Sequence, residues 1–159
     1  MTTIITTITT ASKLADYYIW FANDVGSYLS NHKLQKLLYY AQAWYLAFED
    51  TPLFDEDFEA WVHGPTIPAL FYEYKEQFDW KPILKEVEKP EFSEEVQEFL
   101  DELSDDYLFR DAYELELMLR REDPWINARG ELPRDEPSHA IITKESMRNF
   151  YKNRVIEEN

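Results

Sequence analysis

Residues 31–49, with the sequence NHKLQKLLYYAQAWYLAFE, decide the fold of this chain. At about 100° per residue of an α-helix, one arc of this segment carries the apolar residues Leu34, Leu37, Leu38, Ala41, Tyr45 and Phe48. Tyr39 and Leu46 lie on other faces, and only Lys33 and Lys36 mark a strip that we expect to face solvent. A helix that is apolar on most sides is normally buried on most sides. We therefore expect the other elements to surround this helix.

The remaining helices are predicted from N-cap residues, prolines and apolar stripes. They run from Thr10 or Ser12 to Gly26, from Ile67 to Phe78, from Ser93 to about Leu103, from Asp111 to before Pro124, and from Thr143 onward. Alternation in residues 58–62 predicts a strand that ends at Gly64 and Pro65, and residues 140–142 form a second candidate strand that could pair with it. The predicted fold is mainly α: a compact bundle of about six helices around a central buried helix, with a small two- or three-stranded antiparallel sheet.

Length and composition favour one globular domain. With 159 residues, of which 45% are hydrophobic, the chain can bury one core. We expect an N-terminal arm at residues 1–10 and a single domain at 11–159. The chain has no cysteine, which fits a reducing cytoplasm, where we expect the protein to act. The apolar stretch 37–48 is too short to span a bilayer, and the opening MTTIITTITT lacks the features of a signal peptide.

The charge of the chain narrows the possible partners. Its 32 acidic and 16 basic residues give a formal net charge of −16. Such a chain repels nucleic acid and anionic membranes, so we expect neither as a partner. Its electric field favours encounter with a basic protein surface. The alternative is that the acidity serves only to keep an aromatic-rich domain in solution.

Three blocks of sequence carry a resemblance to a known family. They are KLQKLLYYAQAWYLA at residues 33–47, PLF at 52–54 leading to EAWVHGP at 59–65, and EDPW at 122–125. In this order they resemble the Panacea domain of SocA-like antitoxins, which occur in bacteria and in association with phages. The resemblance covers roughly residues 11–152. The family often has a Thr-His pair ahead of the last motif, where this chain has Leu119 and Arg120, so any role of that histidine is in doubt here.

The resemblance implies an antitoxin that neutralises, by direct binding, a protein toxin encoded by the adjacent gene. It also implies the class of toxin: an alarmone-synthetase-like enzyme or another protein that blocks translation. One alternative is an adaptor that delivers the toxin to a cytoplasmic protease, and another is an enzymatic antitoxin that reverses the toxin's product. His32, His63 and His139 lack helical metal-ligand spacing, and common catalytic motifs are missing. We therefore expect no enzymatic activity and no cofactor or metal site.

Several motif residues are expected to have structural roles. Gln35 and Gln42 project from one side of the central helix. Buried amides need hydrogen-bond partners, so we expect both to bind backbone groups of the 61–65 turn, the alternative being contact with a ligand or a partner. The sequence Asp123-Pro124-Trp125 should end a helix, with Trp125 packed on the core. We expect Glu122 to pair locally with Arg121 or Arg129.

Partner contacts are expected from aromatic residues outside the helical stripes and from the turn after the first predicted strand, because tryptophan and tyrosine dominate binding hot spots. These candidates are Trp20, Tyr40, Trp44, Trp61, His63, Gly64, Pro65, Tyr72 and Trp80. The alternative for the turn residues is that they hold the next helix in place, and for the other aromatic residues it is burial in the core. The acidic runs at 55–57 and 105–106 either form the rim of a site for a basic toxin or are simply solvated.

Overall fold

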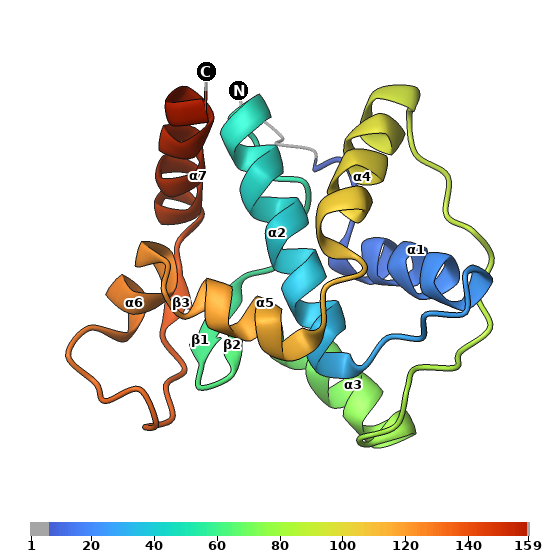
Figure 1. Ribbon diagram of the computed structural model, residues 1–159, viewed down its shortest axis with the longest axis horizontal. Helices are drawn as coiled ribbons and strands as arrows, with labels where there is room; N and C mark the ends of the chain where they lie inside the picture. Colours follow the sequence, from blue (N-terminus) through green and yellow to red (C-terminus); the bar gives the residue numbers. More distant parts are fainter. Residues whose placement is uncertain (1–6, 159) are drawn as a thin grey trace, which may run out of the picture.

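A computed structural model describes the backbone of residues 7–158 and the side chains of residues 7–155. Within this part the elements are α1 Ala11–Asp24, α2 Asn31–Glu49, β1 Phe58–Trp61, β2 Gly64–Thr66, α3 Pro68–Phe78, α4 Glu94–Tyr107, α5 Ala112–Leu119, α6 Asp123–Arg129, β3 Ile141–Ile142 and α7 Lys144–Glu158 (Figure 1). The predicted class, mainly α with a small antiparallel sheet, is confirmed. Most of the predicted N-terminal arm, residues 1–6, lies outside the described residues. No described helix is long and apolar enough to cross a membrane.

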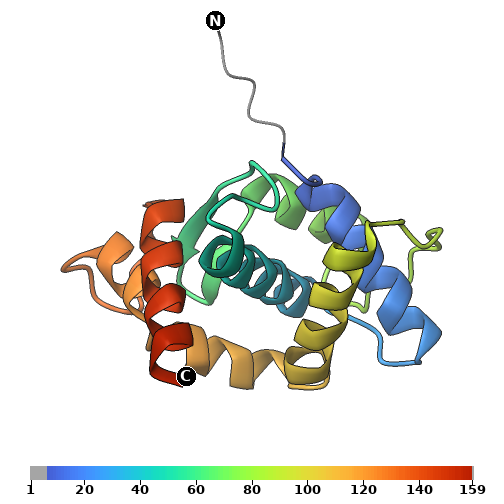
Figure 2. The same ribbon diagram turned by 90° about the horizontal axis from the view of Figure 1, so that it is seen from above.

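Helix α2 is the central element, as its sequence predicts. It contacts α1, α3, α4, α5 and α7, and Figure 2 shows it in the middle of a ring of these helices. Two details of the predicted stripe are wrong. Lys36 is only 2% exposed, because β2 and α5 pack over the strip that was expected to face solvent. Phe48 is 54% exposed, because it stands in the last turn of α2, where it stacks on Trp44 at the edge of the core.

Local sequence signals fix the beginnings of four helices. The side chains of Thr10, Ser30, Ser93 and Asp111 each accept a hydrogen bond from the backbone N–H three residues later. Each such cap stabilises its helix by about 1 kcal/mol. These caps place the beginnings of α1, α2, α4 and α5 where the sequence predicts them.

Helix α6 is not predicted by the sequence. Residues Asp123-Pro124-Trp125 were expected to end a helix, but α5 already ends at Leu119, and Asp123 begins α6. Proline is well tolerated in the first turn of a helix, where its missing N–H would be unpaired in any case. Pro124 therefore helps to begin a helix, and the described part has seven helices where about six were predicted.

The sheet is a small antiparallel unit with the order β2-β1-β3. Ile141 and Ile142 pair with Glu59 and Phe58, which confirms the predicted pairing of the two strands. The strand predicted at 58–62 ends before Gly64, as expected, but Gly64 and Pro65 themselves belong to a further strand, β2, which begins opposite Trp61. Gly64 has φ of +115°, a conformation that residues with a Cβ rarely adopt. Proline is tolerated in β2 because this is an edge strand.

Candidate partner-binding surface

Two buried glutamines of α2 hold the neighbouring loops. The Gln35 carbonyl oxygen accepts from the Ile67 N–H at 2.9 Å. The Gln42 carbonyl oxygen accepts from the Leu53 N–H at 2.8 Å, and its amide donates to the Phe54 carbonyl at 2.7 Å. Their structural role is as expected, but neither binds the 61–65 turn. Seven residues of helix separate them by about 10 Å, so one short turn could not serve both.

Trp125 joins α6 to the sheet. Its ring is buried, as expected, and its indole N–H donates to the Trp61 carbonyl at 2.8 Å. The Arg129 guanidinium lies 4.7 Å from the centre of the Trp125 ring and donates to the Ala60 carbonyl at 2.9 Å. Buried tryptophan usually finds a partner for its N–H. These contacts fix the backbone of β1 directly before the β1–β2 turn, and so fix the turn itself.

The β1–β2 turn forms the centre of an aromatic surface. We call this the hairpin surface and define it by His32, Trp61, Val62, His63, Tyr72, Trp80 and His139. All of these except Trp80 line a cavity of about 320 Å³, and Trp80 adjoins it by stacking on His32 with ring centroids 5.8 Å apart. Tyr72 is 55% exposed and Trp80 is 74% exposed. Trp61 is half-buried and lies 5.1 Å from the Phe71 ring and 5.8 Å from the Tyr72 ring.

Four of the predicted partner-binding residues, Trp61, His63, Tyr72 and Trp80, therefore come together on the hairpin surface. Gly64 and Pro65 do not share that exposure. Both are buried in β2, because the edge strand packs against α2. They shape the turn that presents the aromatic residues.

The other three candidates lie elsewhere. Tyr40 is 1% exposed and stacks on Tyr107 with ring centroids 4.0 Å apart, so its expected exposure is wrong. It is buried because Tyr107 of α4 and Tyr151 of α7 cover its ring. Trp44 is half-buried beside α4 and donates to the Tyr107 hydroxyl at 2.9 Å. Trp20 is half-buried on α1, where the Lys89 ammonium lies 5.0 Å from its ring centre.

The two acidic runs have different environments. Within residues 55–57, Asp57 pairs with Lys144 at 2.7 Å, and Glu56 accepts from the backbone N–H that begins α1. This run therefore ties parts of the fold together. Asp105 and Asp106 are exposed on the last turns of α4.

Burial sets the protonation of the basic groups behind the hairpin surface. Burial, assisted by Lys36 and His63, lowers the pKa of His32 to about 4, so its ring is neutral at pH 7. Burial also lowers the pKa of Lys36 to about 8, against the opposing effect of Glu116. The His63 Nδ1 lies 2.9 Å from a Glu116 carboxylate oxygen. The hairpin surface thus presents aromatic rings and imidazole nitrogens, which can contact the side chains of another protein.

The burial of the Glu122 carboxylate is not predicted by the sequence. Glu122 is not paired with Arg121 or Arg129, as was expected. It accepts a hydrogen bond from the Tyr151 hydroxyl and lies 3.6 Å from the Arg154 guanidinium, so both partners come from α7. Burial raises the pKa of Glu122 and these two partners lower it; the effect of burial is larger, so the pKa is about 7. The sequence gives no signal for this, because the partners are about 30 residues away.

Sequence comparison identifies the family. Residues 34–126 match the family described as antitoxin SocA-like, Panacea domain, which is more than half of the chain. No curated protein and no solved structure matches the chain. The matched range contains Gln35 and Gln42, the β1–β2 turn, and Trp125, which fixes that turn. Of the hairpin surface, it contains all residues except His32 and His139. The chain therefore belongs to the SocA-like Panacea-domain antitoxin family.

Proposed function

We propose that this protein is an antitoxin that neutralises a cognate protein toxin by direct binding, without catalysis, in the cytoplasm. Membership of the family supports a toxin as the partner in general. The observation that carries the proposal of direct binding is the hairpin surface, where the exposed rings of Tyr72 and Trp80 accompany the half-buried ring of Trp61. The product of the adjacent gene is the proposed toxin, and an alarmone-synthetase-like enzyme or another translation-blocking protein is its proposed class.

The hairpin surface has the physical properties of a binding hot spot. Tryptophan and tyrosine at the centre of an interface commonly contribute about 2 kcal/mol or more each to the binding free energy. Trp80 stacks on His32, and its 74% exposure leaves a large apolar area for a partner to cover. Trp61 is held by the Phe71 ring and by a 2.9 Å hydrogen bond from its indole N–H to Glu59. A ring that is already held loses little conformational entropy on binding.

The net charge supports a basic toxin. A formal charge of −16 steers a positively charged partner toward the protein and raises the association rate. Such steering weakens as salt screens the field. Charge and aromatic surface then have separate roles: the charge speeds the encounter, and the rings make the complex last.

Co-expression with the adjacent gene product tests the proposal, with growth rescue and co-purification scored together. The wild-type chain should rescue growth and form a stable complex. Tyr72→Ser/Trp80→Ser should lose both, whereas Phe109→Ser, which removes another exposed ring, should keep both. Rescue without a stable complex would instead indicate enzymatic reversal of the toxin's product. Loss of the toxin that depends on a protease would indicate an adaptor.

A further inference from the structure

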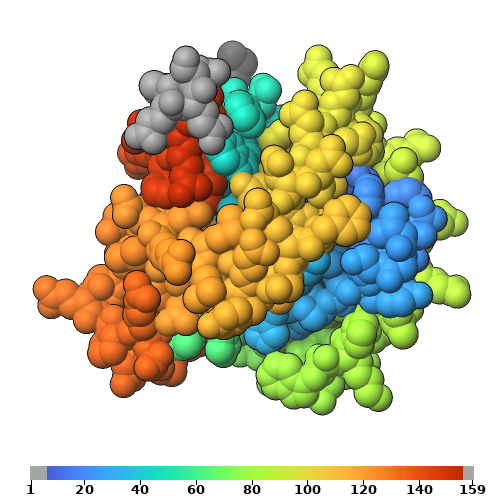
Figure 3. All heavy atoms as spheres, viewed as in Figure 1, coloured from blue at the N-terminus to red at the C-terminus, as the bar shows by residue number. Residues whose placement is uncertain are grey.

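A second hollow, lined by aromatic rings and glutamates, lies at the other end of α2, between its last turns and α4. It has a volume of about 420 Å³ and adjoins a hollow of about 230 Å³ that also touches Phe48, Phe99 and Glu102. We call the two together the α2–α4 groove. The hairpin surface includes His32 in the first turn of α2, whereas the groove begins at its C-terminal half, so the two sites are separate (Figure 1). Figure 3 shows the end of α2 reaching the surface between α4 and α7.

Aromatic rings form the floor of this groove. The Phe99 ring of α4 packs edge-on against Tyr45 at 5.5 Å and Phe48 at 6.3 Å, measured between ring centroids. Phe48 also stacks on Trp44 at 5.7 Å. The rings support one another and yet leave Phe48 more than half exposed. An apolar side chain from a partner would bury this uncovered area and gain the usual hydrophobic stabilisation.

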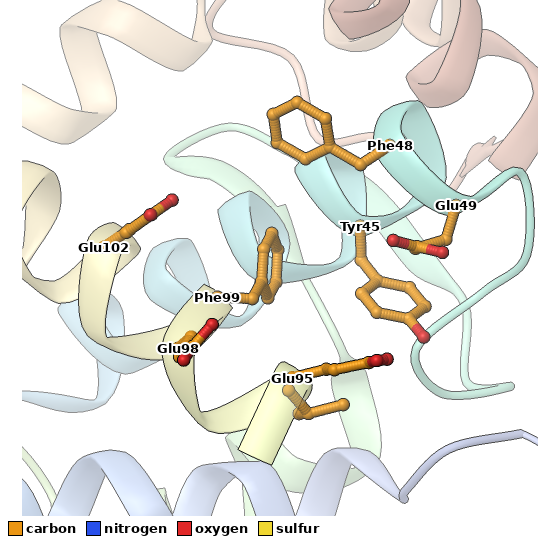
Figure 4. A pocket seen from close by; sticks show the side chains of 8 residues that line it. Tyr45, Phe48, Glu49, Glu95, Glu98, Phe99 and Glu102 are labelled. Carbon is orange, nitrogen blue, oxygen red and sulfur yellow. The ribbon is translucent and has the colours of Figure 1, made fainter. Parts of the chain in front are cut away.

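Carboxylates form the rim. Glu49, Glu95, Glu98 and Glu102 surround the rings in Figure 4. All four are exposed, and none of them forms an ion pair with any of the residues in the described part of the chain. Like charges at i and i+4, such as Glu98 and Glu102, repel each other on a helix. Burial, together with Glu49 and Glu95, raises the pKa of Tyr45, as expected in a negative environment.

We propose that the α2–α4 groove is a second docking site, which takes a basic amphipathic segment of the toxin. The inference rests on the proposed function and adds a chemical class of ligand. An apolar side chain of the segment lies on the rings, and lysine or arginine residues on either side pair with the rim. Glu95, Glu98 and Glu102 follow one face of α4 over about 10 Å, so cations at the same helical spacing in the partner can meet all three. Such a segment would relieve the repulsion among these carboxylates.

A peptide experiment tests the chemistry of the groove without the toxin. The probe is a fluorescein-labelled synthetic peptide in which lysines recur every three to four positions beside a stripe of leucines, and binding is followed by fluorescence anisotropy at physiological salt. Glu98→Lys/Glu102→Lys should weaken binding about tenfold or more, since it reverses two rim charges. The matched control Glu86→Lys/Glu88→Lys changes two exposed residues that do not line the groove, and it changes the net charge by the same amount. This control should weaken binding less than about threefold, because it alters only the net charge of the protein. Equal weakening by both variants would overturn the proposal.

The same variants, measured against the adjacent gene product, separate this inference from the proposed function. The groove variant and Phe48→Ser should each bind the toxin about tenfold more weakly or worse, because each removes a charge or a ring that the partner would contact. The affinity of the control variant should stay near that of wild type. If the wild-type complex forms and the groove variants bind equally well, the inference is overturned and the proposed function stands. If the wild-type chain forms no complex, both are overturned. Unchanged circular dichroism and melting temperature confirm that each variant is folded.

Discussion

The buried carboxylate of Glu122 should make the protein less stable as the pH rises through the neutral range. Its pKa is 4.5 in an ordinary environment and about 7 in the folded protein. Between these values the folded state holds a proton that the unfolded state has released, so the free energy of unfolding falls as the pH rises. The contribution of this bound proton to the free energy of unfolding is fully present below about pH 4.5 and lost above about pH 7. Its full size is about 3 kcal/mol, at about 1.4 kcal/mol for each pH unit.

Glu122→Gln isolates this effect, because glutamine keeps the shape and can still accept a hydrogen bond from the Tyr151 hydroxyl. Urea unfolding should be followed by tryptophan fluorescence from pH 4.5 to pH 8 for both proteins. His32, whose pKa is lowered to about 4, acts in the opposite direction, but the difference between the two proteins cancels it. The unfolding free energy of wild type minus that of the variant should fall by up to about 3 kcal/mol over this range. A difference that stays constant or rises with pH would show that Glu122 does not bind its proton more tightly in the folded protein.

Three further predictions concern the buried polar contacts and the charge. Gln42→Leu should lower the unfolding free energy by about 2–4 kcal/mol in urea titrations, because the N–H of Leu53 and the carbonyl of Phe54 lose a buried partner; a loss below 1 kcal/mol would contradict this. Trp125→Phe should cost about 1–3 kcal/mol in the same assay, since the Trp61 carbonyl loses its indole donor, and an unchanged stability would show that the bond is unimportant. In stopped-flow mixing with the adjacent gene product, the association rate should fall about tenfold or more between low and high salt; a rate independent of salt would rule out steering by charge.

The architecture follows from local sequence signals to a large extent. The apolar arc of α2 predicts its burial, and the caps at Thr10, Ser30, Ser93 and Asp111 place four helices, because both signals act within a few residues. The errors arise where distant segments decide the outcome. The burial of Lys36 depends on how β2 and α5 pack, and nothing near Lys36 in the sequence specifies that packing.

The candidate surface is predictable only in part for the same reason. Tyr72 and Trp80 lie outside the apolar stripes of the predicted helices, and this position correctly identifies their rings as exposed. The same criterion also selects Tyr40, which neighbouring helices bury. The stacking of Trp80 on His32 depends on the irregular connection after α3, which has no periodic pattern. The α2–α4 groove was not foreseen. The acidic spacing of Glu95, Glu98 and Glu102 is visible in the sequence, but the exposure of Phe48 beside them is not.

Calorimetric titration of the purified chain with the adjacent gene product tests most directly whether the exposed rings hold a toxin. We expect a stable complex whose dissociation constant rises by about a hundredfold or more in Tyr72→Ser/Trp80→Ser, since two hot-spot rings contribute about 3–4 kcal/mol or more. Phe109→Ser should leave the constant within about threefold of wild type, as expected for a ring outside the interface. If the wild-type chain gives no binding heat, or if all three proteins bind with equal affinity, the exposed rings do not hold the toxin.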